Sequence, residues 1–463
     1  MDSKSSTRLH FVGIGGIGMS GIAEVFLNQG YAISGSDQVE SDTTKRLASL
    51  GAKICIGHAA PNVSGANVVV ISSAVKSTNP EVIEARRLRI PVIPRAEMLG
   101  ELMRGKTGIA VAGTHGKTTT TSMLATVLIQ AGLDPTLVIG GKVDSLGGNA
   151  KLGKGTLVVA EADESDGSFL FLPATYGIIT NIDSDHLDHF GSLENIERAF
   201  LDFVDKLPFY GLAVVCGEDA GVRKCLSLWT KPVSTYGFKP EWDLYADEIQ
   251  SRGLGSSFQV WQRALVTEKH RSLGRFEIHV PGDHNVLNAL ACIAIAKKLG
   301  LTDGQIREGL AEFRGVKRRF EIRWRDEANR KIIVDDYGHH PTEIRATLAA
   351  ARKFWDGRVI AVFQPHRYSR TQSCHADFLK AFAQTDVLLV LDIYAAGEEP
   401  IAGISGESLA RDIGASSHAT PEVLYVGDFA RAKTEVEKRF KTGDLVLCLG
   451  AGSITRFPEQ IIP

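Results

Sequence analysis

The stretch GTHGKT, Gly113–Thr118, joins an apolar run at Ile109–Ala112 to a helical pattern over Thr118–Ala131. An order of strand, glycine-rich turn and helix places backbone N–H groups at a helix N-terminus, where phosphate groups bind. Val111 stands where the first glycine of the full G-x-x-x-x-G-K-[ST] pattern would be. The second half of that pattern is intact, and it predicts a phosphate-binding loop.

Three residues of this loop suit a nucleotide triphosphate. Gly116 permits close approach of a phosphate, Lys117 neutralises the β- and γ-oxygens, and the Thr118 hydroxyl can bind Mg²⁺. A lysine left unpaired in a buried turn would be costly. We therefore expect Lys117 to meet an anionic ligand.

The alternation of an apolar run, a glycine-containing turn and a helical pattern recurs along the chain. It predicts α/β units with parallel sheets, and 463 residues predict roughly three domains at about 150 residues each. We expect an N-terminal Rossmann-like domain over residues 1–105, a central P-loop ATPase-like domain with a mostly parallel sheet over 106–314, and a C-terminal Rossmann-like domain over 315–463.

The composition is that of an ordinary globular protein. Apolar residues make up 44% and charged residues 23%, which excludes a disordered, collagenous or coiled-coil chain. The 52 Lys and Arg balance 54 Asp and Glu, so we expect no nucleic acid and no anionic membrane as partner. Six scattered cysteines, a polar N-terminus and the absence of a run of about 18 apolar residues predict a soluble, cytoplasmic protein.

A second glycine loop lies near the N-terminus. Gly13-Ile14-Gly15-Gly16-Ile17-Gly18 fits G-x-G-x-x-G between a strand and a helix, and Asp37 lies 19 residues past Gly18. The glycines let backbone N–H groups approach a pyrophosphate, and the acid can bind a ribose hydroxyl. A tight turn without a ligand is the structural alternative.

Two further loops carry candidate metal ligands. Glu161–Asp166 (EADESD) follows the predicted strand Leu157–Ala160, and its four carboxylates repel one another unless cations lie among them. A solvated acidic loop is the alternative. His186 follows the predicted strand Ile178–Asn181, and it is either a metal ligand or a hydrogen-bonded surface histidine.

In the C-terminal half, polar groups again follow predicted strands. Adjacent histidines in Asp335–Pro341 (DDYGHHP) should diverge, which makes a zinc site improbable. The two arginines of His366–Arg370 suit carboxylate or phosphate recognition, or else are simply solvated. His284 and Asn288 open a helical pattern, where they could bind an adenine edge or cap the helix.

Together these motifs resemble the Mur ligases of bacterial cell-wall synthesis, most closely the branch that joins L-alanine to UDP-N-acetylmuramate. The resemblance spans nearly the whole chain and rests on nine short motifs in order. They are Gly13–Gly21, Ser72–Val75 with Asn79–Glu81, Gly113–Thr121, Glu161–Phe169, Thr180–His186, Pro281–Asn288, Lys317–Glu321, Asp335–Glu343 and Gln364–Thr371.

The resemblance implies a UDP-binding domain, an ATPase domain and a C-terminal domain that closes over them. UDP-sugar binding would fall to Gly13, Gly15, Gly16, Gly18, Asp37, Ser72 and Ser73. ATP would contact Gly113, Thr114, His115, Gly116, Lys117, Thr118, Thr119, His284, Asn288, Arg319 and Asp336. Two Mg²⁺ ions would be held by Thr118, Glu161 and His186. The catalytic residues would be Lys117 and His186 together with His339 and Arg370, which would orient the amino acid.

The implied reaction activates the muramate carboxylate as an acyl phosphate, which the amine of L-alanine then attacks. The implied partners are therefore UDP-N-acetylmuramate, L-alanine and ATP, and we expect a monomer or a weak homodimer. Sister ligases carry a modified lysine some fifteen residues after the metal histidine, whereas Ala199–Asp202 contains none, as in the alanine-adding branch.

Three alternatives remain open from the sequence. A murein-peptide recycling ligase shares the ATP loop but differs in the N-terminal glycine pattern. A nicotinamide-dependent oxidoreductase would use Gly13–Gly18 and Asp37, but it leaves Gly113–Thr118 unexplained. A P-loop NTPase that drives a conformational switch would hydrolyse ATP without any amino acid.

Overall fold

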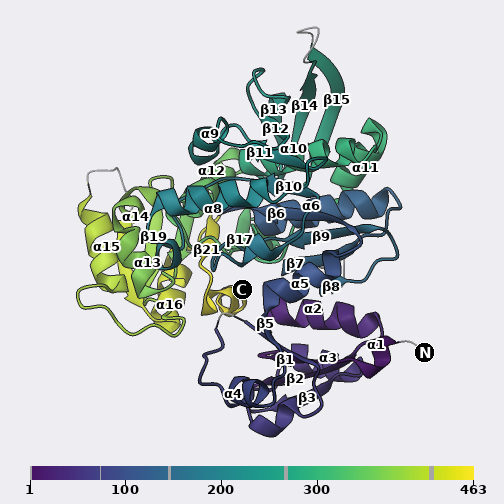
Figure 1. Cartoon of the computed structure of the whole chain (residues 1–463). Coiled ribbons are helices and arrows are strands. Elements are labelled where there is room, and N and C mark those ends of the chain that lie inside the picture. The colour runs from purple at the N-terminus through teal and green to yellow at the C-terminus, as the bar shows by residue number, and fades with distance from the viewer. Residues whose placement is uncertain (1–2, 73, 144–147, 265–269, 417–421, 463) are drawn as a thin grey trace. The chain divides into compact units, whose positions relative to one another are not determined.

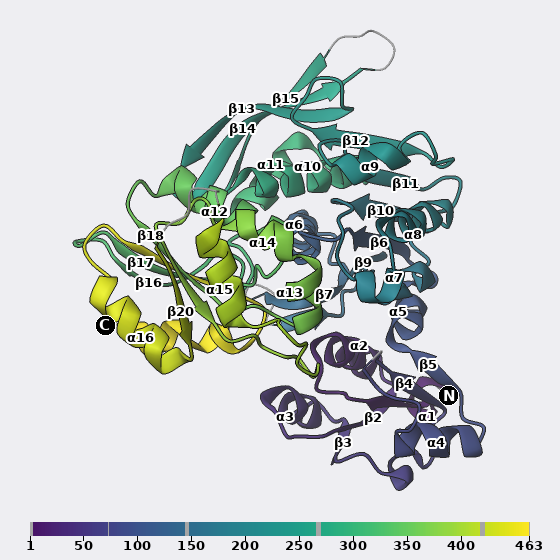
Figure 2. The same ribbon diagram turned by 90° about the vertical axis from the view of Figure 1, so that its left-hand side faces the viewer.

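The computed structural model describes residues 3–72, 74–143, 148–264, 270–416 and 422–462. These residues form three sheets, one after another along the chain (Figures 1 and 2). By density of contacts the chain divides into two units. The first comprises Met1–Asp247, Val260–Gly274 and Leu287–Glu312, and the second comprises Glu248–Gln259, Arg275–Val286 and Phe313–Pro463.

The N-terminal sheet is parallel, with strand order β3-β2-β1-β4-β5. Its strands are β1 (Arg8–Val12), β2 (Ala32–Asp37), β3 (Lys53–Ile56), β4 (Val68–Ile71) and β5 (Val92–Pro94). Its helices are α1 (Ser3–Ser6), α2 (Ile17–Asn28), α3 (Asp42–Ser49), η1 (Ala60–Val63), α4 (Pro80–Arg87) and α5 (Arg95–Met103). The strand order reverses between β1 and β4, which is where ligands bind in open α/β sheets.

The central sheet has ten strands in the order β15-β14-β13-β12-β11-β10-β6-β9-β7-β8. They are β6 (Thr107–Ala112), β7 (Thr136–Val143), β8 (Gly148–Lys151), β9 (Leu157–Glu161), β10 (Tyr176–Ile179), β11 (Leu212–Cys216), β12 (Val233–Gly237), β13 (Leu244–Arg252), β14 (Gly255–Arg263) and β15 (His270–Ile278). The run from β12 to β7 is parallel, and β8 pairs with β7 in the antiparallel sense. Parallel strands end at one edge of the sheet, so the loops after β6, β9 and β10 are brought together there.

Helices cover the central sheet (Figure 2). They are α6 (Lys117–Gln130), η3 (Ser168–Phe171), α7 (Leu187–Phe190), α8 (Leu193–Asp205), α9 (Ala220–Cys225), α10 (Asp283–Lys298) and α11 (Asp303–Glu312). Almost every residue of α6 from Thr118 to Leu128 is buried, because this helix lies between the sheet and α11. A helix that is enclosed in this way holds the turn at its N-terminus in one position.

The C-terminal sheet has the order β16-β17-β21-β18-β19-β20 and is parallel except for β16. Its strands are β16 (Glu321–Asp326), β17 (Lys331–Asp336), β18 (Val359–Phe363), β19 (Val387–Leu391), β20 (Glu422–Gly427) and β21 (Leu445–Leu449). Its helices are α12 (Pro341–Phe354), α13 (Tyr368–Ser373), α14 (His375–Ala381), α15 (Gly406–Ala415), α16 (Phe429–Arg439), η4 (Ser453–Arg456) and α17 (Pro458–Ile461).

Both faces of the C-terminal sheet are buried, which explains its continuously apolar strands. Val359, Ala361 and Phe363 pack into the core formed with α12, α14 and α15. The alternate residues Ile360 and Val362 pack on the opposite face, against α16 and the C-terminal segment.

The predicted α/β class with mostly parallel sheets is confirmed. Each sheet falls within one of the predicted domains 1–105, 106–314 and 315–463, but the boundaries themselves stay a prediction. Among the strands that the sequence analysis did not anticipate are β7 and the edge strands β8 and β16. Two glycines interrupt β7, and β16 is rich in charged residues, so neither shows a strong strand pattern.

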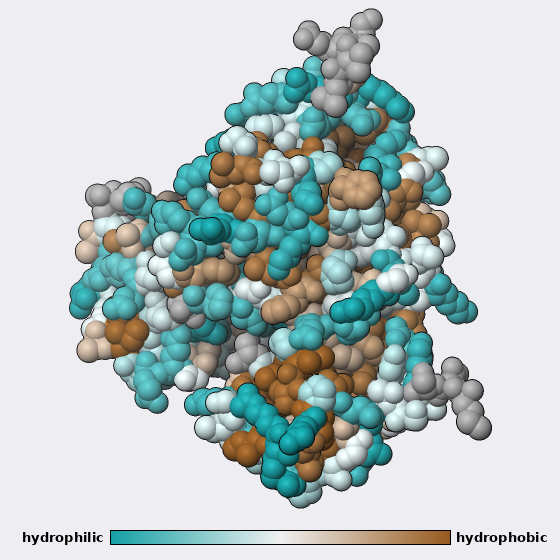
Figure 3. All heavy atoms as spheres, viewed as in Figure 1, coloured by the Kyte–Doolittle hydropathy of each residue, from teal (hydrophilic) through white to brown (hydrophobic). Residues whose placement is uncertain are grey.

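No helix among the described residues is long and apolar enough to cross a membrane. On the face seen in Figure 3, hydrophilic side chains are interspersed with apolar ones.

Candidate active site

The turn after β6 requires glycine at two positions. Gly113 has φ +126°, and a Cβ atom there would lie 2.0 Å from Thr180 Oγ1. Gly116 has φ +82°, and its Cβ would lie 3.1 Å from Asn288 Oδ1. The Thr180 hydroxyl donates a hydrogen bond of 2.6 Å to the carbonyl of His115. The turn is therefore held closely against β10 and α10 at the carboxyl edge of the sheet.

Lys117 is held by oxygens of the protein itself. Its ammonium donates to the carbonyls of Gly113 at 2.7 Å and Thr114 at 3.1 Å, and it lies 2.8–2.9 Å from both carboxylate oxygens of Glu164. The side chains of Lys117 and Glu164 are 13% and 2% exposed. The sequence analysis did not foresee that Glu164 supplies a counter-charge for Lys117. That Lys117 binds a phosphate stays a prediction.

The Lys117–Glu164 pair has unusual acid–base properties. Burial raises the pKa of Glu164 to about 7, against the attraction of Lys117. Burial alone would lower the pKa of Lys117, but Glu164, Asp163 and Glu161 together raise it. A lysine that stays charged in a buried turn can bind phosphate oxygens. Glu164 lies within the acidic cluster that the sequence singled out, but the pattern gave no sign of which acid meets the lysine.

Thr118 and Glu161 lie side by side. The Thr118 hydroxyl donates to Glu161 Oε1 at 2.9 Å, and Glu161 Oε2 accepts from the backbone N–H of Gly140 at 2.7 Å. A side chain at Gly140 would collide with this carboxylate, since its Cβ would lie 2.7 Å from it. A hydroxyl and a carboxylate next to a phosphate loop are hard oxygen ligands, which fit Mg²⁺. The sequence analysis assigned both residues to magnesium binding, although they lie 43 positions apart in the chain.

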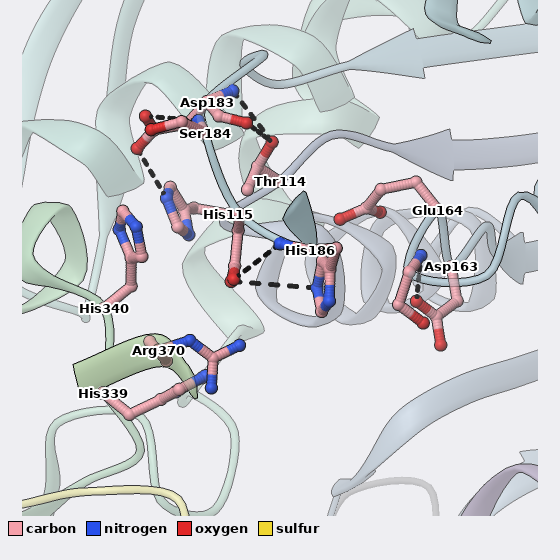
Figure 4. Close-up of polar contacts among 12 residues, drawn as sticks. Thr114, His115, Asp163, Glu164, Asp183, Ser184, His186, His339, His340 and Arg370 are labelled. Atoms are coloured by element: carbon pink, nitrogen blue, oxygen red, sulfur yellow. Dashed lines mark hydrogen bonds and ion pairs between the residues drawn. The ribbon is translucent and has the colours of Figure 1, made fainter. Parts of the chain in front are cut away.

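The segment after β10 is bound to the phosphate loop (Figure 4). Asp183 Oδ2 lies 3.0 Å from His115 Nε2, and the N–H of Asp183 donates to the Thr114 hydroxyl at 2.9 Å. Asn181 accepts from the N–H of His115 at 2.8 Å and donates to its carbonyl at 3.0 Å. His115 and Thr114 therefore anchor the loop to its neighbour, a role that sequence reasoning did not distinguish from ATP contact.

His186 ends this segment in the left-handed region, with φ 56°. Its Nε2 lies 3.7 Å from Asp185 Oδ2, and a quarter of its side chain is exposed. Because β10 and β6 are adjacent parallel strands, His186 lies at the same sheet edge as the phosphate loop. A second metal ion at His186 stays a prediction.

His284 and Asn288 lie one turn apart on α10. Asn288 is buried against Gly116 of the phosphate loop, as noted above. The His284 side chain is exposed in its unit. Partial desolvation, together with the nearby cations Arg319 and Lys353, lowers its pKa to about 4. His284 is therefore a neutral ring at physiological pH, able to donate or accept a hydrogen bond.

In the second unit, Asp336 orders the loop after β17. Its carboxylate accepts from the N–H groups of Phe320 at 2.7 Å and Gly338 at 2.8 Å, and from the Thr347 hydroxyl at 3.1 Å. Burial raises its pKa, against the attraction of Arg319. Asp336 therefore serves the loop's own structure, whatever else it contacts.

Arg319 lies on the Tyr337 ring, 4.8 Å from the ring centroid, and its Nη1 is 3.4 Å from Glu343 Oε1. The adjacent histidines diverge as predicted. His339 Nδ1 lies 3.1 Å from the Tyr337 carbonyl, whereas His340 is buried and caps α12 through a bond from the N–H of Thr342.

Arg370 lies on α13 and is only 9% exposed. Its Nη1 is 3.4 Å from His366 Nδ1, and the His366 ring is 5.6 Å from that of His339. Burial, His339 and Arg370 lower the pKa of His366 to about 3. The two residues expected to orient an amino acid, His339 and Arg370, thus both lie next to the neutral His366 ring.

The N-terminal glycine loop lines a cavity of about 720 Å³ at the end of the N-terminal sheet. The lining residues are Gly13, Gly15, Gly16, Asp37, Gln38, Val39, Ser41, His58, Ser72, Ala74, Val75, Lys76, Thr78 and Asn79. This is the point where the strand order reverses. Five of the seven residues expected to bind a UDP-sugar line it.

The other two residues differ in placement. A Cβ atom at Gly18 would lie 2.6 Å from Arg95 Nη1, so Gly18 serves packing against α5 and does not line the cavity. Ser73 lies outside the described residues. Asp37 already accepts a bond of 2.8 Å from the N–H of Gly15, so its carboxylate braces the glycine loop.

Comparison with known proteins identifies the family. Three family models match in order: the Mur ligase family catalytic domain at 8–107, the Mur ligase middle domain at 111–296 and the Mur ligase glutamate ligase domain at 318–452. A UDP-N-acetylmuramate–L-alanine ligase of Trichlorobacter lovleyi is 53% identical over 457 residues, which cover 98% of both chains.

Solved structures give the same picture. The crystal structure of a UDP-N-acetylmuramate–alanine ligase from Thermotoga maritima is similar with a TM-score of 0.81 and 32% identity, covering 98% of each chain. A murein peptide ligase from Psychrobacter arcticus covers 98% of each chain with a TM-score of 0.70, but at 24% identity it shows the fold alone. The matches over nearly the full length, with the phosphate loop and acidic strand end in place, show that the chain belongs to the Mur ligase family.

Proposed function

We propose that this chain is an ATP-dependent ligase that joins L-alanine to the carboxylate of UDP-N-acetylmuramate in peptidoglycan precursor synthesis. The observation that carries the proposal is the 53% identity over 98% of the chain to a ligase named for that reaction. The geometry of Lys117, Thr118 and Glu161 agrees with it, because these groups suit the binding of a nucleotide triphosphate.

ATP provides the chemical drive. A carboxylate does not react with an amine at neutral pH because its leaving group is poor, and transfer of the γ-phosphoryl converts it into an acyl phosphate. The amine of alanine then attacks the acyl carbon, and phosphate leaves. Lys117 stabilises the charge that develops on the transferred group.

Thr118, Glu161 and His186 are the residues that would hold magnesium. Mg²⁺ supplies positive charge to the phosphate oxygens. Thr118 and Glu161 offer adjacent oxygen ligands on neighbouring elements. Because the N–H of Gly140 holds the Glu161 carboxylate, this side chain has little freedom to rotate. The pair of oxygen ligands is therefore pre-organised.

The remaining assignments are part of the same proposal. The N-terminal cavity takes the UDP-linked substrate. For ATP, the proposal keeps the residues that the family resemblance implies, which are Gly113–Thr119, His284, Asn288, Arg319 and Asp336. His339 and Arg370 orient the amino acid. The expected monomer or weak homodimer and the cytoplasmic location stay predictions.

The test is phosphate release from Mg·ATP with UDP-N-acetylmuramate and alanine, glycine or serine in separate reactions. We expect release that requires both the UDP-sugar and alanine, with a ligated product of matching mass. Release without an amino acid would favour a P-loop NTPase that drives a conformational switch. Activity with a peptide and not with alanine would favour a murein-peptide ligase.

A further inference from the structure

A buried polar network lies beneath the N-terminal cavity and has no role in the chemistry above. We call it the Glu81 network, and its members are His10, Ser36, His58, Asn62 and Glu81. Glu81 lies in the first turn of α4 and is 0% exposed, as are His10 and Ser36. Glu81 ends the motif Asn79-Pro80-Glu81, which is part of the family resemblance described in the sequence analysis.

The Glu81 carboxylate lies within hydrogen-bonding distance of four donor groups. Its Oε2 accepts from the Ser36 hydroxyl at 2.6 Å, and its Oε1 accepts from Asn62 Nδ2 at 2.5 Å and from the N–H of Ala59 at 3.3 Å. His10 Nε2 lies 3.5 Å from Oε2. A buried carboxylate with this many donors is ionised, and it acts as a fixed acceptor.

The network decides which nitrogen of His58 carries a proton. The Ser36 hydroxyl has one hydrogen, and it donates that hydrogen to Glu81. Ser36 Oγ therefore accepts from His58 Nδ1, which lies 2.9 Å away. His58 Nδ1 also lies 3.6 Å from Glu81 Oε2. Nδ1 is thus the protonated nitrogen, and in the neutral ring Nε2 carries a lone pair.

His58 presents that lone pair on the cavity side. It lines the cavity, and its side chain is 17% exposed whereas Glu81 behind it is fully buried. Nδ1 faces the network, so Nε2 lies on the opposite edge of the ring. Within the described part of the chain, the structure gives Nε2 no hydrogen-bond partner.

The sheet order places His58 at one end of the cavity. The glycine loop follows β1, Asp37 ends β2, and His58 comes two residues after β3 ends. Since the strands are ordered β3-β2-β1, these groups lie in sequence across the sheet edge. A diphosphate at Gly13–Gly16 and a ribose at Asp37, as the sequence analysis expects, would leave the β3 side of the cavity, which His58 lines, for the nucleobase.

We propose that His58 Nε2 accepts the imide N3–H of uracil, and that Glu81, through Ser36, is the positioning residue that keeps His58 in this acceptor form. Uracil has a hydrogen on N3, whereas cytosine has a lone pair there and would face the lone pair of Nε2. The inference rests on the proposed function, because it assigns the base selectivity of the same substrate site.

The test compares binding of UDP, CDP and N3-methyl-UDP by calorimetry on the whole chain. We expect the unaltered protein to bind UDP at least tenfold more tightly than the other two. In His58→Leu the preference for UDP over CDP should fall below about threefold. His279→Leu, which removes an exposed histidine elsewhere, should keep the full preference.

Glu81→Gln tests the positioning role with a separate readout. Nitrogen-15 spectra of His58 should show a proton on Nδ1 in the unaltered protein and a mixture of the two tautomers in Glu81→Gln, with reduced UDP selectivity. A purely structural role for Glu81 would lower stability and leave the tautomer of the folded fraction unchanged, which would overturn that assignment.

Two results would overturn the inference as a whole. One is equal affinity of the unaltered protein for UDP and N3-methyl-UDP, a measurement that needs no variant to fold. The other is undiminished UDP preference in a folded His58→Leu protein. Failure of the proposed function is distinguishable, because it would appear as absent alanine-dependent ligation by the unaltered protein whatever the base selectivity.

Discussion

Glu164→Gln should abolish the protein's own contribution to the pH dependence of ATP binding, which in the unaltered protein weakens binding about tenfold at pH 8 relative to pH 6. The reason lies in the contact between Glu164 and Lys117, at 2.8–2.9 Å. When ATP binds, contacts between Lys117 and the phosphates must replace the contact between Lys117 and Glu164. A buried carboxylate left without its counter-charge next to a phosphate is unfavourable, so binding should be coupled to proton uptake by Glu164.

The magnitude follows from the pKa of Glu164, which burial raises to about 7. At pH 8 the carboxyl group is ionised at a ratio of about ten to one, and protonating it costs about 1.4 kcal/mol. At pH 6 it is already mostly protonated, and the cost is about 0.1 kcal/mol. The glutamine amide stays neutral at both pH values and still offers Lys117 an oxygen.

The assay is calorimetric titration of each protein with a non-hydrolysable ATP analogue and Mg²⁺ at pH 6, 7 and 8. Protonation of the nucleotide itself affects both proteins equally, so the difference between their slopes isolates Glu164. Asp166→Asn is the matched control, because Asp166 lies in the same acidic loop but accepts its bond from the N–H of Ser168. Equal slopes in the unaltered protein and Glu164→Gln would refute the reasoning.

Three further predictions concern other parts of the chain. Lys117→Ala should abolish turnover and leave the Kd for the UDP-sugar within about twofold, since the two sites are separate; near-normal turnover would exclude the phosphate role. Arg370→Ala should raise the KM for alanine at least tenfold more than the KM for ATP, and steady-state kinetics with an unchanged alanine KM would dismiss that contact. Burial raises the pKa of Glu81, but its hydrogen bonds outweigh this and lower it from 4.5 to about 2. Glu81 therefore contributes about 3 kcal/mol above pH 4.5 that is lost as the pH falls towards 2, so urea unfolding should show a smaller loss of stability between pH 5 and 3 in Glu81→Gln.

The sequence by itself determined the elements that depend on neighbouring residues. The turn of Gly113–Thr118 could be predicted because its strand, its left-handed glycine and its helix are consecutive. The N-terminal glycine loop was predicted for the same reason. The order of these loops along the chain also identified the family, and with it the mostly parallel sheets.

Tertiary structure alone decided which polar groups meet. Glu164 reaches Lys117, Asp37 braces the N–H of Gly15, and Glu81 collects donors from several separate segments. Such contacts depend on the order of strands in a sheet and on the direction of each side chain, and local pattern specifies neither. The sequence shows that acidic residues gather after β9, but only the folded chain shows that Glu161 accepts a hydrogen bond from Thr118 while Glu164 pairs with Lys117. Residues three positions apart leave the strand end in different directions.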